Sequence, residues 1–263
     1  MAEKHLQDGK GPFRAEQLED GDRYELSGGH PVYCAPAGRD HAAHNLTGAS
    51  VLDSDPDVEW AGVDAGFAPE PGTLRAPDVA VASPGDTRGW IPGVPPLAVE
   101  YAAHGQDEED LQRKITELLK NGTRQIWVVR LIGPRRVEVY APEQPLRIMG
   151  PGDLLDAPGI LRNPVPVEAL YDRRAGHRAT LRNLLQREGY EDLEAVLREG
   201  REEGLAESVL TLLQGRGITV PGDVETRITA CRDTTALKIW LLAAARVDRA
   251  EAIFGDKPPM STE

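Results

Sequence analysis

Two acids and one lysine have the types and spacing to do chemistry together: Asp78, Glu100 and Lys114. The acids belong to two apolar segments, residues 76–82 and 97–102, and Lys114 belongs to a segment with helical spacing that follows them. A buried strand should not carry a carboxylate unless something compensates its charge. Two carboxylates ~4 Å apart repel by roughly 4 kcal/mol at an effective dielectric near 20. We therefore expect a divalent cation between Asp78 and Glu100.

Magnesium (or manganese) is the cation that such ligands favour, because Mg²⁺ takes carboxylate oxygens and keeps several waters. The metal would acidify a bound water and offset the charge of a phosphate. Lys114 would orient or deprotonate that water, or steady the phosphoryl charge, and the backbone carbonyl of Tyr101 would be a further ligand. Asp110 would support the site or cap its helix, and His104 would either line the cleft or be an ordinary loop histidine.

A purely structural interpretation of the same residues stays open. Asp78 follows a proline and could simply begin a strand. Glu100 could pair with an arginine or with Lys114 as a structural ion pair, and Lys114 could be a solvated helix residue.

The elements that must position these residues alternate between strands and helices. Residues 76–82 and 97–102 predict two neighbouring strands, and residues 107–119 predict a helix that ends at Asn121-Gly122. A hairpin is predicted over residues 24–33, a helix over residues 40–52 with Asp40 as its cap, and further strands over 125–129 and 136–140. We expect a mixed α/β (α+β) sheet flanked by helices.

The chain changes character near residue 175. Residues 1–17 are expected to be disordered, residues 18–172 to form the mixed α/β domain, and residues 256–263 to be a disordered tail. Residues 175–255 have leucines at helical spacing and predict an all-α segment, with helices at residues 223–231 and 234–246. We interpret this segment as a docking or oligomerisation module.

Composition limits the functions that the chain can have. The 263 residues carry a formal net charge of −13, which argues against a dedicated DNA-binding protein but permits a local basic groove. Apolar runs are too short for a membrane helix, and the N-terminus lacks the pattern of a signal peptide. Cys34 and Cys231 lie far apart in sequence, so free thiols in a reducing cytoplasm are expected, although a disulfide between them stays open.

Other polar residues are candidates for a site. His41 and His44 are three residues apart and could form a metal pair on one helix face, but the sequence offers them no evident carboxylate partner. Two arginine pairs could contact phosphate, although solvated surface is the plainer interpretation: Arg135-Arg136 and Arg173-Arg174.

An ordered set of short motifs over residues 18–172 resembles the Uma-two family of endonuclease-like proteins, within the PD-(D/E)XK restriction-endonuclease-like superfamily. The motifs include an opening hairpin with Glu25, a histidine at the start of the first helix (His41), Pro77-Asp78-Val79, residues 97–100 ending in Glu100, and Asp110 with Lys114 in a D-x-x-x-K pattern. The resemblance implies a restriction-endonuclease-like core from a bacterial source. It also implies Asp78 and Glu100 as metal ligands, Lys114 as the displaced motif lysine, and Glu25, His41 and Asp110 close around them.

The chain departs from the family pattern near the site. Residues 103–105 read Ala-His-Gly where the family has Ser-Pro-Ser, His30 replaces an acid, and Leu118 replaces a tyrosine. The sequence is therefore compatible with two functions. The first is a metal-dependent endonuclease that binds nucleic acid, with DNA expected in preference to RNA, in a local cleft and as a homodimer. The alternative is a catalytically inactive nuclease-fold scaffold that acts through its helical segment.

Overall fold

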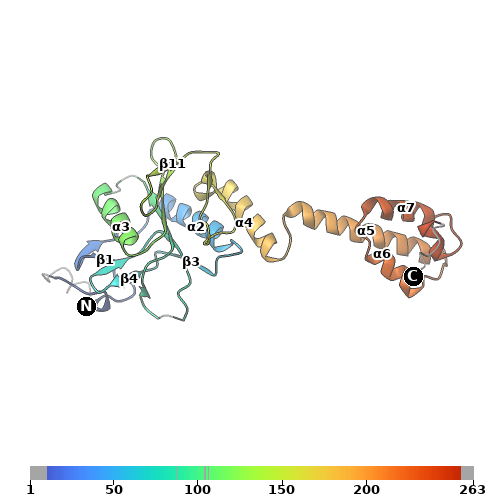
Figure 1. Ribbon diagram of the computed structural model, residues 1–263, viewed down its shortest axis with the longest axis horizontal. Coiled ribbons are helices and arrows are strands. Elements are labelled where there is room, and N and C mark those ends of the chain that lie inside the picture. Colours follow the sequence, from blue (N-terminus) through green and yellow to red (C-terminus); the bar gives the residue numbers. More distant parts are fainter. Residues whose placement is uncertain (1–10, 87, 104, 106, 256–263) are drawn as a thin grey trace. The chain divides into compact units, whose positions relative to one another are not determined.

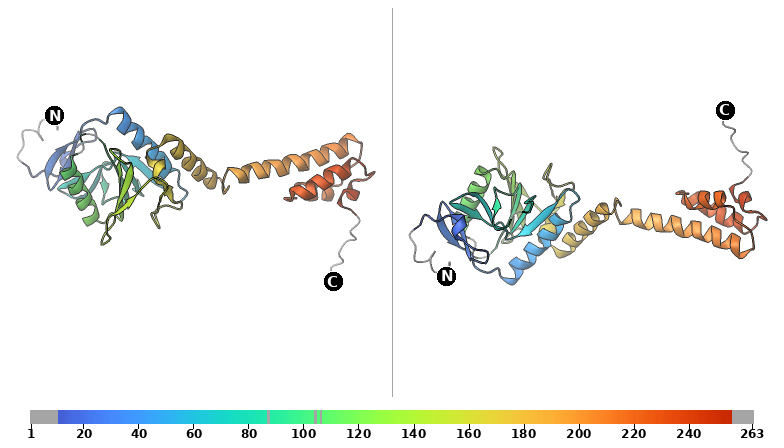
Figure 2. Two further views of the ribbon diagram at one scale, coloured as in Figure 1. Left: turned by 90° about the horizontal axis from the view of Figure 1, so that it is seen from above. Right: turned by 90° about the horizontal axis from the view of Figure 1, so that it is seen from below.

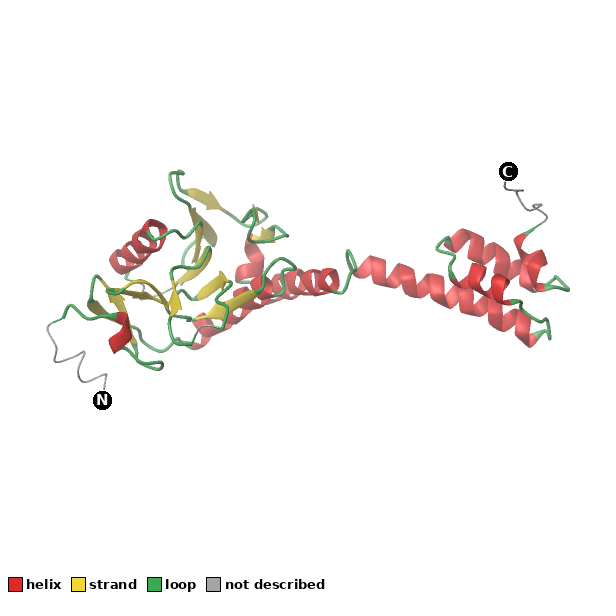
Figure 3. Ribbon diagram, turned by 60° about the horizontal axis from the view of Figure 1, so that its bottom comes forward, coloured by secondary structure: helices red, strands yellow, loops and turns green. Residues whose placement is uncertain are grey.

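The computed structural model describes residues 11–255 apart from 87, 104 and 106, and the chain divides into two compact units. The first unit is Met1–Glu188 and the second is Gly189–Glu263. Figure 3 shows that the strands belong to the first unit and that the second is built from helices. The mixed α/β class and the all-α C-terminal segment that the sequence predicts are both confirmed.

A six-stranded sheet forms the centre of the first unit, in the order β11-β10-β9-β8-β6-β3. Its strands are β3 (Trp60–Val63), β6 (Val79–Ala82), β8 (Leu97–Ala102), β9 (Gln125–Arg130), β10 (Arg136–Tyr140) and β11 (Arg147–Met149). Only β8 and β9 run parallel, and α3 (Glu108–Lys120) connects them. The crossover brings residues of α3 back over β8.

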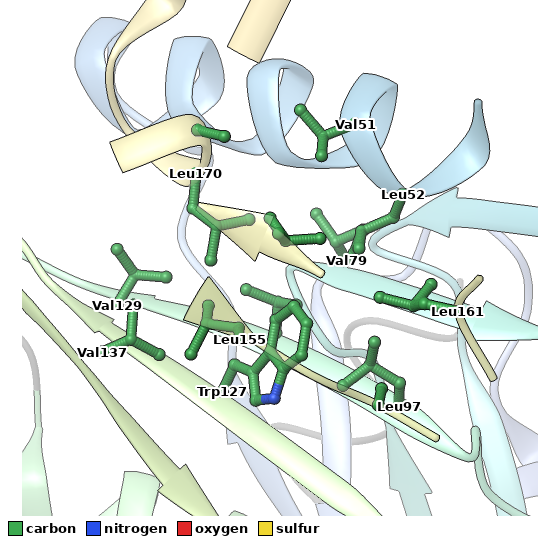
Figure 4. Close-up of a cluster of buried hydrophobic side chains, with 14 of the residues drawn as sticks. Val51, Leu52, Val79, Leu97, Trp127, Val129, Val137, Leu155, Leu161 and Leu170 are labelled. Atoms are coloured by element: carbon green, nitrogen blue, oxygen red, sulfur yellow. The ribbon is translucent and has the colours of Figure 1, made fainter. Parts of the chain in front are cut away.

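Alternation along β8 sends its side chains to two different layers, because successive side chains of a strand point to opposite faces. Val99 and Tyr101 face a core that also contains Val51 and Leu52 of α2 (Arg39–Asp53). Figure 4 shows Trp127 and Leu97 beneath α2 in this core. On the other face, Ala98 and Ala102 pack with apolar residues of α3.

Glu100 shares the α3 face of β8 by the same alternation. Figures 1 and 2 show α3 on one side of the strands and α2 with α4 (Arg173–Arg187) on the other. The acid therefore lies under a helix, where a charged partner can reach it.

A second, five-stranded sheet has the order β2-β1-β5-β4-β7. Its strands are β1 (Tyr24–Ser27), β2 (His30–Tyr33), β4 (Phe67–Glu70), β5 (Thr73–Arg75) and β7 (Ile91–Pro92). Phe13 and the short helix η1 (Ala15–Gln17) pack against Leu26 and Leu74 of this sheet. The expectation of a disordered segment over residues 1–17 is thus wrong for residues 11–17, because Phe13 is buried; residues 1–10 and 256–263 lie outside the described residues.

The helix α4 belongs to the first unit, although the sequence placed the start of the helical segment at residue 175. Asn183 donates to the Val51 carbonyl and to Ser54, and Arg187 donates to four carbonyls in residues 53–58. The first unit is completed by β12 (Leu154–Leu155), β13 (Val165–Pro166) and η2 (Val167–Leu170). The division between units therefore falls after Glu188.

The second unit has a small core of its own. It contains α5 (Leu193–Gly215), α6 (Gly222–Thr229), α7 (Thr234–Ala244) and η3 (Ala250–Phe254). Buried Val209, Leu213, Ile228 and Leu237 hold these helices together. Among the described residues, no helix is both long and apolar enough to span a membrane.

Two details near the site differ from the sequence expectations. Asp78 lies just before β6 instead of inside it, since the strand begins at Val79. Gly38, not Asp40, is the N-cap residue of α2, and its backbone makes the cap without a side-chain hydrogen bond.

Candidate active site

Lys114 is buried beneath α3, in contact with the acid of β8. Leu111, Lys114, Ile115 and Leu118 form one buried stripe of the helix. The Lys114 ammonium lies 2.9 Å from Oε1 of Glu100 and 3.1 Å from Oε1 of Glu25, and it donates to the Ala76 carbonyl at 2.7 Å. Two of these three oxygens, those of Glu25 and Ala76, accept hydrogen bonds from the ammonium. The Glu100 contact is an ion pair that lacks hydrogen-bond alignment, so Oε1 of Glu100 keeps an unused acceptor position.

Asp78 is fixed beside Glu100 by the backbone of β8 and by α2. Its Oδ2 accepts a 2.6 Å hydrogen bond from the backbone N–H of Tyr101, the residue after Glu100. Its Oδ1 lies 2.9 Å from Nε2 of His41 and 3.5 Å from Nδ2 of Asn45, both on α2. The sequence interpretation that His41 lacks an evident carboxylate partner is therefore wrong.

Burial and neighbouring charges set the ionisation of this cluster. Burial opposes ionisation of Asp78, but the His41 hydrogen bond and the Lys114 charge lower its pKa. Burial raises the pKa of Glu100, and the charges of Asp78 and Glu25 add to this effect against that of Lys114. Burial disfavours the Lys114 ammonium, yet the charges of Glu100 and Glu25 outweigh it and raise the pKa. Lys114 is thus held as a cation at neutral pH.

Arg75 of β5 lies behind this cluster, and the sequence analysis missed it. Its side chain is fully buried and donates from Nη1 to Glu25 at 2.9 Å and from Nε to Glu117 at 2.6 Å. Its Nη2 lies 3.7 Å from Oδ1 of Asp110. A signal existed in the sequence, because an arginine stands in an apolar segment three residues before Asp78.

The residues present fit a divalent metal in charge and donor type. Among the described residues, Lys114 pairs with Glu100 and Glu25, and Arg75 pairs with Glu25; the charge of Lys114 also acts on Asp78, and Asp64 adds another carboxylate. Asp64 has a left-handed φ of 52°, and burial together with the charge of Asp78 raises its pKa. Within the described part of the chain, however, no three acid, histidine or cysteine side chains converge on one point. Any further ligands at Asp78 and Glu100 would come from backbone or water.

Other residues that the sequence analysis singled out are Asp110, His44 and His104. Asp110 does not cap α3, because Asp107 is the N-cap residue and accepts from the Asp110 N–H. Asp110 lies beside Arg75 instead. His44 stacks on Tyr101 with ring centroids 6.0 Å apart, whereas His41 contacts Asp78. His104 lies outside the described residues.

A hollow of about 520 Å³ lies beyond the C-terminal end of β8. Arg130 and Arg136 line it, but both pair with Glu138, and Arg130 also pairs with Glu108. Asp78, Glu100 and Lys114 are not among its lining residues. The cluster of acids and this hollow are therefore neighbours and not one site.

The sheet with its one parallel pair, the flanking helices and the Asp-Glu-Lys cluster define a protein with a nuclease-like fold. The model of the Uma2 family, described as "Putative restriction endonuclease", matches residues 13–165. The chain belongs to this family. A solved structure with a similar fold is titled a "putative nuclease belonging to DUF820" from Anabaena variabilis ATCC 29413; it is 19% identical, with a TM-score of 0.53, and the match covers 62% of this chain and 99% of that one. No curated protein matches.

Proposed function

We propose that this protein is a metal-dependent endonuclease that hydrolyses phosphodiester bonds of nucleic acid, with DNA preferred over RNA as the substrate. The proposal rests on the proximity of Asp78, just before β6, Glu100 in β8 and Lys114 on α3: the backbone N–H next to Glu100 donates to Asp78, and Lys114 lies 2.9 Å from Glu100. Membership of the Uma2 family supports the nuclease class.

The roles follow from the geometry. Asp78 and Glu100 would hold Mg²⁺ or Mn²⁺, with the Tyr101 carbonyl as a further ligand, and the metal would supply an activated water and offset phosphate charge. Lys114 is kept protonated by two buried acids, so it serves to stabilise negative charge on the phosphate and not to remove a proton. His41 orients the carboxylate of Asp78 through its 2.9 Å contact.

Plasmid cleavage tests this proposal. Wild-type protein with Mn²⁺ or Mg²⁺ should nick or linearise plasmid, and Asp78→Asn should abolish cleavage because the neutral amide is a poor metal ligand. Arg162→Gln is the control, since the Arg162 side chain pairs with Asp57 and both side chains are about half exposed. Equal cleavage by wild type and by Asp78→Asn would exclude this site.

A second function is favoured by one observation. No trio of metal-binding side chains converges within the described residues, which suits a nuclease fold retained as a scaffold. In that case calorimetry should give no Mn²⁺ binding heat for the wild type. A nuclease should bind Mn²⁺, and Glu100→Gln should remove that binding.

A further inference from the structure

We propose that Arg75 is a positioning residue of the active site, which acts through Glu25 to hold Lys114 against Glu100. This inference deepens the proposed function and rests on it for the catalytic part. The residues form a chain of alternating charges that runs Glu117–Arg75–Glu25–Lys114–Glu100.

The register of the five-stranded sheet begins this chain. Leu26 pairs with Leu74 in the antiparallel β1–β5 ladder, which places Glu25 opposite Arg75. The Glu25 carboxylate then divides its two oxygens, Oε2 to Arg75 at 2.9 Å and Oε1 to Lys114 at 3.1 Å. Because each oxygen has a different cation, the Glu25 side chain is fixed in one orientation.

The second half of the chain is a single face of α3. Asp110, Lys114 and Glu117 are spaced i, i+4 and i+7, so they lie along one side of the helix. Arg75 donates to Glu117 at 2.6 Å and lies 3.7 Å from Asp110. Ser27 of β1 also donates to Glu117, at 2.5 Å. Arg75 thereby ties the five-stranded sheet to the helix that carries Lys114.

An arginine suits this place for a physical reason. Its planar group presents five N–H donors in a rigid fork, whereas a lysine offers a single point charge. Arg75 uses Nε and Nη1 for two different acids while remaining fully buried. A cation that made no more than one of these contacts would leave either Glu117 or the second oxygen of Glu25 without the charged partner that Arg75 supplies.

The proposal predicts that the effect of removing Arg75 depends strongly on Glu25 and Lys114. Urea unfolding without metal tests the link in the full chain: Arg75→Gln should lower the midpoint in the wild-type background and lower it much less in a Glu25→Gln background. Should Arg75→Gln fail to fold, Arg75→Lys takes its place in the same cycle. Arg162→Gln, an exposed ion-paired arginine, should give equal shifts in both backgrounds. Equal shifts for Arg75→Gln would overturn the proposed link, whether or not the protein is a nuclease.

Cleavage kinetics with Mn²⁺ test the positioning role. Arg75→Lys should reduce kcat by about tenfold to a hundredfold, since small misplacement of a reacting group has effects of that order, while KM for plasmid changes little. The same substitution in a Lys114→Met background should cause no further loss. A further loss of equal size, or a change confined to KM, would overturn the positioning role. A wild type without any cleavage would overturn the proposed function and this role together, while the unfolding cycle would still decide the structural link.

Discussion

At the residue scale, the presence of Glu100 in a buried strand is explained by the ammonium group of Lys114, which lies against it. Glu100 points to the α3 face of β8, and Lys114 takes a position in the buried stripe of α3 that an apolar residue would otherwise fill. Both side chains are about 10% exposed. Their pairing therefore takes place at low dielectric, where removing one partner leaves the other charge uncompensated.

Lys114→Met should therefore lower the free energy of unfolding by about 3–5 kcal/mol, the usual cost of breaking a buried pair. Glu25 and Glu100 would both lose their cation, which makes the upper part of that range the expected result. Urea denaturation measures the change. Lys120→Met is the control on the same helix, because the Lys120 side chain is 71% exposed and its ion pair with Glu70 is long, at 3.9 Å. This substitution should change the free energy of unfolding by less than about 0.5 kcal/mol. Equal effects of the two substitutions would contradict the buried-pair account.

At the element scale, α2 approaches β8 closely because it carries a glycine at the contact. A Cβ at Gly48 would lie 2.1 Å from the Tyr101 hydroxyl oxygen. That hydroxyl donates to the Leu170 carbonyl at 2.8 Å, so the tyrosine ring is not free to move away. The close approach also places His41 within reach of Asp78, so Gly48 supports the geometry of the site.

Gly48→Ala should destabilise the protein by about 1–3 kcal/mol, the typical cost of overpacking a filled interior. Gly200→Ala is the same change in another helix, α5, where nothing lies within 4 Å of the added Cβ. That substitution should stabilise its helix by up to about 1 kcal/mol, because alanine is the better helix former. Urea denaturation followed by circular dichroism measures the change in the free energy of unfolding for each substitution, and the two changes should have opposite signs. A stabilising Gly48→Ala would show that the contact with Tyr101 does not restrain α2.

At the scale of the whole molecule, the main hydrophobic core of the first unit is formed by residues of that unit alone. The helix α4 covers α2, and Arg187 near its end donates to the carbonyls of Asp53, Ser54, Asp55 and Val58. The second unit has its own buried cluster. Its exposed apolar residues include Leu193 and Leu197 of α5 and Ile239 and Leu242 of α7.

The fragment Met1–Glu188 should consequently fold and bind Mn²⁺ with the affinity of the full chain. A fragment of residues 1–172, which lacks α4, should not fold cooperatively, because it leaves the carbonyls at the end of α2 without Arg187 and Asn183. Circular dichroism melting and Mn²⁺ calorimetry on the two fragments check this expectation. Cooperative folding of residues 1–172 would place the boundary where the sequence pattern first indicated.

The sequence by itself determined the parts that local patterns encode. The bounds of β8, the helix after it with its buried stripe and the mixed α/β class follow from apolar spacing. The cost of a buried charge required a cation beside Glu100, but the sequence left open whether Lys114 or a metal ion would be that cation. The caps were less well predicted: Asp107 and Gly38 took the places assigned to Asp110 and Asp40.

Only the tertiary structure decided which distant residues complete the site. His41 meets Asp78 across 37 positions of the chain, and Arg75 meets Glu25 across 50. Neither contact leaves a periodic trace, because each depends on sheet register and on how closely two elements pack. Local sequence patterns fix which face of an element is buried, but the partner on the facing element is set by the packing of the whole unit.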